Sequence, residues 1–128
     1  MRVYKTKPFT RFQRRARISD GSLCAAVSDA EAGLIEADLG GGLFKQRVAR
    51  LGAGKRDGFR MVIAYRKGVR AFFLLGFAKS ARANIDDAEL AALKRRAASL
   101  LTAAEHALDT MIADEDLMEV DCGESTQD

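Results

Sequence analysis

The sequence predicts an α+β fold with a short N-terminal strand, two helices, a three-stranded antiparallel meander and a C-terminal helix. Three observations carry this prediction. β-Branched and aromatic residues alternate at the N-terminus, three β-like runs follow the glycines at 40–42, and apolar residues recur at helical spacing after Arg82. The 128 residues, 48% hydrophobic and 30% charged, fit one soluble globular domain.

Residues 1–33 predict the strand and the first two helices. "RVYKT" (Arg2 to Thr6) has the alternation and residue types of a strand. Pro8 suits the first turn of a helix, and Phe9, Phe12 and Ala16 follow it at helical spacing. A second helix is expected from a cap near Ser19 to a stop at Gly33.

The meander is predicted from the runs "LFKQRVARL", "FRMVIAYR" and "VRAFFLLGFA". In the middle run Phe59, Met61, Ile63 and Tyr65 share one face, so Arg60 belongs to the opposite face. Lys67-Gly68 provides a tight turn into the third run. Apolar residues on both faces of the last two runs predict central strands that helices cover.

The C-terminal helix is expected to begin at a capping box, because Asp86 is followed by Glu89 three residues later. Apolar residues then recur at helical spacing to about Ile112. We therefore predict a single domain over residues 1–113 and an acidic C-terminal tail over 114–128. The segment "DEDLMEVD" within that tail either masks a basic surface of the same chain or forms a solvent-exposed helix end or a short strand.

The glycines of "LGAGKRDGFRMVIAY" (Leu51 to Tyr65) do not form a nucleotide-binding loop. Ala49 stands where a P-loop needs its first glycine, and Arg56 replaces the serine or threonine. Gly52, Gly54 and Gly58 also miss the dinucleotide spacing by one residue. The stretch remains either a plain connection or the rim of a site for a polyanion.

Charge is strongly segregated along the chain. Residues 43–82 contain eleven Lys or Arg and one acid, whereas residues 83–128 contain twelve acids and three bases. A positive face that attracts phosphates is one result of such segregation, and a solvated surface with acidic helices is the other.

The two cysteines, Cys24 and Cys122, fit neither a zinc pattern nor a disulfide framework. There is no apolar run near the roughly 20 residues that cross a membrane. A reduced, cytoplasmic location is therefore expected.

Several motifs in register resemble the RelE/HigB/ParE toxins of bacterial toxin–antitoxin pairs. They are Gly58-Phe59-Arg60 at the central strand, Phe77-Ala78-Lys79 at the end of the next strand, and Asn84-Ile85 before the helix. The resemblance covers roughly residues 1–105 and is nearest to the HigB-type or RelE-like branch.

This resemblance implies a ribosome-dependent endoribonuclease that cuts messenger RNA without metal or cofactor. It also implies an antitoxin from a neighbouring gene, of the helix-turn-helix type, that covers the cationic surface. The alternatives are a ParE-like inhibitor of DNA gyrase that cuts no nucleic acid, and an inactive basic RNA-binding module.

RNA cleavage through the 2′-hydroxyl needs cations around the phosphate, a base and an acid. Guanidinium groups match phosphate oxygens bidentately, so we expect the catalytic residues to be Arg60, Lys79 and Arg82. The expected RNA-binding residues are Arg50, Lys55, Arg56 and Phe77, the last stacking on a base or packing in the core.

The sequence does not single out the residues that act as general base and general acid. Asp86 is expected to cap a helix, Tyr65 to pack in the core, and His106 to have a structural or surface position. Lys55 or Lys79, beside other cations, could act as the base.

Overall fold

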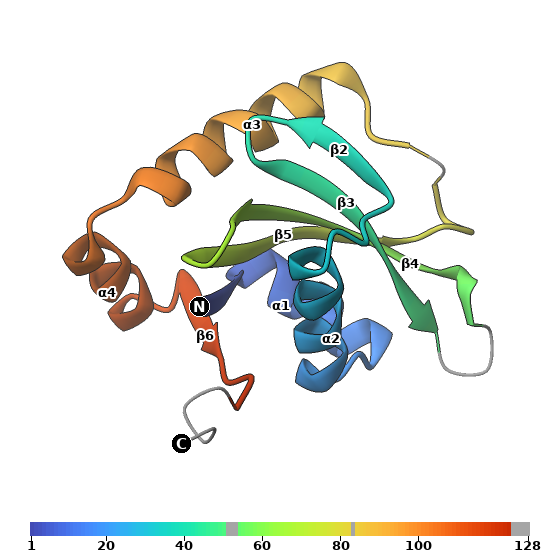
Figure 1. Ribbon diagram of the computed structural model, residues 1–128, viewed down its shortest axis with the longest axis horizontal. Coiled ribbons are helices and arrows are strands. Elements are labelled where there is room, and N and C mark those ends of the chain that lie inside the picture. The colour runs from blue at the N-terminus through green and yellow to red at the C-terminus, as the bar shows by residue number, and fades with distance from the viewer. Residues whose placement is uncertain (51–53, 83, 124–128) are drawn as a thin grey trace.

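The computed structural model describes the chain except residues 51–53, 83 and 124–128, and for Arg50 and residues 54–57 it describes the backbone alone. The described residues form one sheet and helices on both of its faces (Figure 1). The strands are β1 (Arg2–Thr6), β2 (Ala37–Gly40), β3 (Leu43–Arg50), β4 (Gly54–Arg66), β5 (Arg70–Ala78) and β6 (Leu117–Val120). The helices are α1 (Lys7–Ala16), α2 (Asp20–Glu31), α3 (Asp87–Thr102) and α4 (Glu105–Ala113).

The sheet is mixed, with strand order β2-β3-β4-β5-β1-β6 in the described chain. β3, β4 and β5 form the predicted antiparallel meander. β1 then pairs parallel with β5, because α1 and α2 carry the chain across the sheet before the meander begins. The predicted α+β class is confirmed, with β2, β6 and a fourth helix added to the expected elements.

Helix caps follow the local sequence. Thr6 and Ser19 accept hydrogen bonds from backbone N–H groups in the first turns of α1 and α2, and Asp86 does the same for α3. Gly33 has φ +84° just after α2, a conformation that L side chains avoid. These positions agree with the predicted starts and stops.

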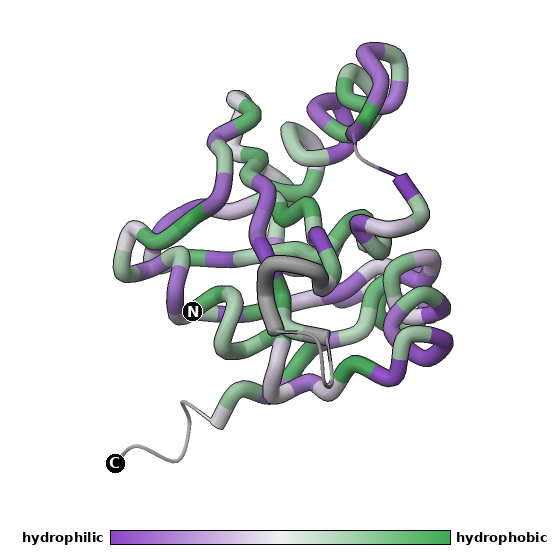
Figure 2. The backbone as a smooth tube through the Cα atoms, turned by 90° about the vertical axis from the view of Figure 1, so that its right-hand side faces the viewer, coloured by the Kyte–Doolittle hydropathy of each residue, from purple (hydrophilic) through white to green (hydrophobic). Residues whose placement is uncertain are grey.

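Two apolar cores lie on opposite faces of the sheet, and Figure 2 shows hydrophobic and hydrophilic residues alternating along the elements that enclose them. The first core packs α1 and α2 against one face and contains Phe9, Leu23, Met61 and Phe73. The second packs α3 and α4 against the other face and contains Tyr4, Val62, Phe72 and Leu100, among others.

The helix expected to run to about Ile112 is two helices. Ala103 and Ala104 have extended backbone angles between α3 and α4. Arg70 Nη1 donates to the carbonyl oxygens of Leu100 and Ala103 at 3.1 and 2.7 Å. A buried guanidinium on β5 therefore supplies hydrogen bonds to the backbone carbonyl oxygens at the end of α3. The sequence itself has no proline or glycine at this break.

The segment expected as an acidic tail contains β6, which pairs antiparallel with β1. Two strands, β1 and β5, separate it from β4, so residues 114–121 do not cover the face of β3 and β4. The short strand that the sequence offered as an alternative to masking is present, as β6.

The two cysteines are bonded to each other, contrary to expectation. Cys24 and Cys122 form a disulfide, so the expectation of unbridged, reduced cysteines is wrong: the sulfurs meet only through tertiary structure. No helix in the described part of the chain has the length and apolar character that would let it span a bilayer.

Candidate functional site

Three side chains form a row across the meander. Arg47 on β3, Arg60 on β4 and Phe77 on β5 are register partners on neighbouring strands. Side chains alternate between the two faces of a strand, so Arg60 lies on the same face of β4 as Val62 and Ala64. Those two residues belong to the core beneath α3. This cross-strand row (Arg47, Arg60 and Phe77) therefore lies on the α3 face of the sheet.

Glu36 connects the two guanidinium groups of the row. It precedes β2, and its backbone N–H donates to the Lys45 carbonyl oxygen at 3.1 Å. Its carboxylate lies 2.9 Å from Arg47 Nε, 3.1 Å from Arg60 Nε and 4.0 Å from Lys45 Nζ. Because Arg60 is only 3% exposed, this carboxylate compensates a charge with little access to water.

The Glu36 carboxylate is held in its ionised form. Burial by itself would raise its pKa. The hydrogen bond from Arg47 and the charges of Arg60 and Lys45 together outweigh burial, so the pKa of Glu36 lies below its usual 4.5. The group is a permanent but weak proton acceptor at neutral pH.

Arg82 lies over the ring of Phe77. Its Cζ is 4.8 Å from the ring centroid, in cation–π geometry. Its Nη1 and Nη2 donate to the two carboxylate oxygens of Glu89 at 2.7 and 3.1 Å. Phe77 is 6% exposed, so a nucleobase cannot reach its ring unless Arg82 moves. Direct stacking on Phe77 is thus disfavoured, and the ring instead supports Arg82.

The remaining predicted residues differ in what the structure says of them. Lys79 is exposed and directly follows β5, where its backbone N–H donates to the Gly58 carbonyl oxygen at 3.3 Å. Lys79 therefore lies at the same end of the meander as Arg60. The side chains of Arg50, Lys55 and Arg56 lie outside the described residues.

The residues weighed as base or acid occupy structural or surface positions. Asp86 caps α3 by accepting from the Glu89 N–H at 2.8 Å. Tyr65 packs edge-on against Phe44 and donates its hydroxyl hydrogen to Glu31. His106 is exposed on α4.

Sequence reasoning missed Glu36, Lys45 and Arg47. The charge pattern held a usable signal, since Glu36 belongs to the run of residues 18–42 that has five acids and no base. Such a segment next to a cationic meander predicts an ion pair, but it does not predict which acid makes it.

A surface hollow of about 510 Å³ lies near the termini, and a second one of about 370 Å³ adjoins Glu36. The second is lined by Asp29, Leu34, Ile35, Glu36, Gln46 and Arg47. Leu34 is 63% exposed and Ile35 is 39% exposed. An apolar surface therefore borders the cationic end of the row.

The arrangement is suited to a phosphate-bearing ligand. Two guanidinium groups lie on one sheet face, a third cation rests on the adjoining aromatic ring, and an ionised carboxylate stands between the first two. Guanidinium forks bind phosphate oxygens, and the carboxylate accepts protons.

Comparison with known proteins identifies the family of the chain. No curated protein matches the chain. Residues 1–120 match the family model described as the RelE toxin of the RelE/RelB toxin–antitoxin system. That match spans β1 to β6 and includes every residue of the cross-strand row. The chain therefore belongs to the RelE toxin family and is the toxin of a toxin–antitoxin pair.

Proposed function

We propose that this toxin is a ribosome-dependent, metal-independent endoribonuclease of the HigB/RelE-like branch that cuts messenger RNA in the cytoplasm and so arrests translation. The observation that carries the proposal is the ionised Glu36 carboxylate between Arg47 and Arg60 on one sheet face. This set of groups contains both the charge that a phosphate needs and a proton acceptor beside it.

Arg47 is the first phosphate ligand in this proposal. Its Nε donates a hydrogen bond to the Glu36 carboxylate, and its side chain is 50% exposed. Its terminal guanidinium nitrogens have no partner within the described ranges. A phosphate that binds there needs no existing bond to break. Arg60 and Arg82 add positive charge at the inner end of the same site.

The proposed cleavage assigns one role to each group. Glu36 takes the proton of the 2′-hydroxyl, and the 2′ oxygen attacks the adjacent phosphorus. Arg47, Arg60 and Arg82 stabilise the negative charge of the pentacoordinate phosphate. The bond from phosphorus to the 5′ oxygen then breaks, and Lys79 donates a proton to that oxygen. The products are a 2′,3′-cyclic phosphate and a 5′-hydroxyl.

The experiment induces the toxin in bacteria and maps the ends of messenger RNA on translating ribosomes. Arg47→Gln and Lys79→Ala remove exposed side chains, so the fold is retained and cleavage is expected to fall by about 10²-fold or more. Arg11→Ala on α1 is the matched control, since Arg11 is also exposed and lies in the helix layer of the opposite face. Intact messenger RNA under the wild-type toxin refutes the proposal.

A ParE-like attack on DNA gyrase is the second candidate, and the pairing of Arg60 with Glu36 and of Arg82 with Glu89 favours it. Cations that are already neutralised bind a phosphate less strongly. Induction of the DNA-damage response without cut messenger RNA supports this candidate. Salt-sensitive RNA binding with neither effect supports an inactive binding module.

The antitoxin of this pair is proposed to be a helix-turn-helix protein that covers the cross-strand row. Leu34 and Ile35 border Arg47 at the hollow beside Glu36. A segment with a bulky apolar side chain and a nearby carboxylate complements this surface, because it fills the hollow and pairs with Arg47.

A further inference from the structure

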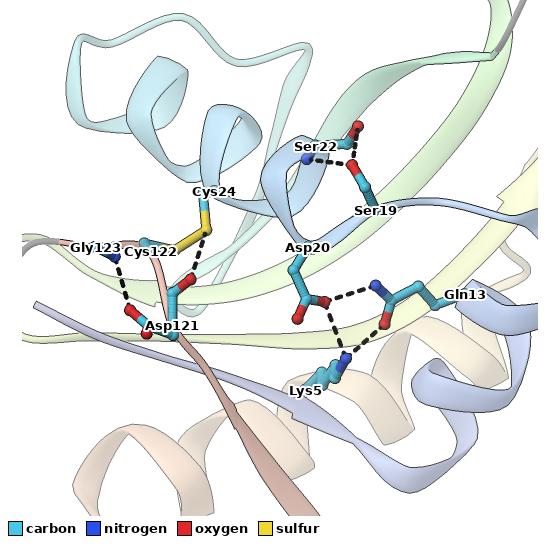
Figure 3. Close-up of a disulfide and its surroundings, with 9 residues drawn as sticks. All are labelled: Lys5, Gln13, Ser19, Asp20, Ser22, Cys24, Asp121, Cys122 and Gly123. Carbon is cyan, nitrogen blue, oxygen red and sulfur yellow. Dashed lines mark hydrogen bonds and ion pairs between the residues drawn. A yellow bond between two sulfur atoms is a disulfide. The ribbon is translucent and has the colours of Figure 1, made fainter.

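The disulfide joins two segments that lie at opposite ends of the sequence (Figure 3). Cys24 is in the second turn of α2, and Cys122 follows β6 by two residues. They are 98 residues apart in sequence, and their Cα atoms are 5.5 Å apart. The chain has no other cysteine, so the bridge has no competing partner within the molecule.

The α2 side of the bridge is anchored by other bonds. Asp20 Oδ1 accepts hydrogen bonds from Gln13 Nε2 at 2.7 Å and from Lys5 Nζ at 3.0 Å, as Figure 3 shows. Lys5 Nζ also donates to Gln13 Oε1 at 2.8 Å. Ser19 caps the helix. This network ties the start of α2 to α1 and β1, so α2 keeps its position without the disulfide.

The C-terminal side has weaker anchors beyond the end of β6. β6 is a four-residue edge strand, and β1 is its one strand neighbour in the described chain. The ion pair between Arg2 and Glu119 joins side chains that are 41% and 43% exposed, and such exposed pairs contribute little. Val120 is buried in the first core and Leu117 in the second, whereas Cys122, beyond the strand, packs only at the margin of the first core. The residues that follow Val120 therefore depend on the bridge more than α2 does.

Small thiols and disulfides can reach the bridge. Cys24 and Cys122 are both half-buried. Cys122 lines the surface hollow of about 510 Å³ together with residues from β1 and β6. A fully enclosed sulfur would resist exchange, whereas this position gives a reagent a path to it.

We propose that Cys24 and Cys122 form a redox-sensitive bridge that fastens the C-terminal segment to α2. The oxidant is a low-molecular-weight disulfide such as oxidised glutathione. One cysteine thiolate attacks it and releases one thiol, and the second cysteine thiolate then displaces the other thiol. The protein loses two hydrogen atoms, and one disulfide is converted to two thiols. Reduction by the reverse exchange releases β6 from α2.

The test compares the purified full chain after equilibration with oxidised glutathione and after reduction with dithiothreitol. A disulfide of typical strength is expected to raise the folding equilibrium constant roughly 30- to 700-fold. Urea unfolding of the two forms measures this change. Limited proteolysis of the reduced form is expected to cut first within residues 114–123, and mass spectrometry locates the cut.

Cys122→Ser is the main variant, and Cys24→Ser is its matched partner. Each is expected to match the reduced wild-type chain in stability. Its remaining cysteine forms at most a mixed disulfide with glutathione, so oxidised glutathione should not restore the stability of the bridged form. If either variant fails to fold, the wild-type comparison still decides. Free thiols in the oxidised sample, equal stability of the two forms, or first cuts outside the C-terminal segment overturn the proposal. Because Cys24 and Cys122 lie outside the cross-strand row, these outcomes are independent of RNA cleavage.

Discussion

Replacing Glu36 with glutamine tests the central ion-pair cluster. The change keeps the side-chain shape and removes the charge that contacts Arg47, Arg60 and Lys45. Removing one partner of a fully buried ion pair costs ~3–5 kcal/mol. Water reaches Glu36, whose side chain is 17% exposed, so we expect a loss of ~2–3 kcal/mol in the free energy of unfolding.

Arg47→Gln is the matched control because it breaks the same cluster at its exposed end. The Arg47 side chain is 50% exposed, so its loss should cost no more than ~1 kcal/mol. Urea denaturation followed by circular dichroism measures both variants, and Glu36→Gln should lower the midpoint by about 1 M or more. A Glu36→Gln loss no larger than that of Arg47→Gln refutes the reasoning.

The loss of stability in Glu36→Gln should depend on pH. The pKa of Glu36 is lowered in the folded protein. Its stabilisation is therefore complete above the unfolded pKa near 4.5 and disappears as pH falls through the lower folded pKa. The stability gap between wild type and Glu36→Gln should be largest near neutral pH and should close on acidification.

Glu36→Gln should also separate RNA binding from RNA cleavage. Removing a negative charge beside Arg47 and Arg60 should tighten binding of a short RNA by about fivefold at low salt. Cleavage should nevertheless fall, because the proposed proton acceptor is gone. Binding and cleavage that fall together would contradict the assigned role.

Two further predictions concern the surface and the sheet. Leu34→Ser combined with Ile35→Ser adds no charge beside Arg47, so it should leave toxicity intact and weaken neutralisation by the antitoxin encoded beside the toxin, whereas the exposed control Val69→Ser should be neutralised like wild type; equal neutralisation of both variants counts against the surface. Gly76→Ala should cost ~1–3 kcal/mol in thermal unfolding, because its Cβ would overlap a phenylalanine ring of α1. Gly21→Ala, whose nearest atom would be 3.6 Å away, should be neutral or stabilising, and a milder effect at Gly76 would show that the ring shifts freely.

The sequence by itself determined the local structure of this protein. Ser19 and Asp86 cap helices where the spacing predicts, and Gly33 ends α2 with positive φ. The strand alternation also placed Arg60 on the face opposite Met61, as observed. These features depend on neighbours within about four residues, so a linear pattern records them.

Only the tertiary structure decided which groups meet. Glu36 reaches Arg60 across 24 residues, and Cys24 reaches Cys122 across 98. Arg70 ends α3 from a distant strand. Each pairing follows from the sheet order and register, which no short-range pattern encodes. The same order buries the charge of Arg60 and brings a carboxylate beside it.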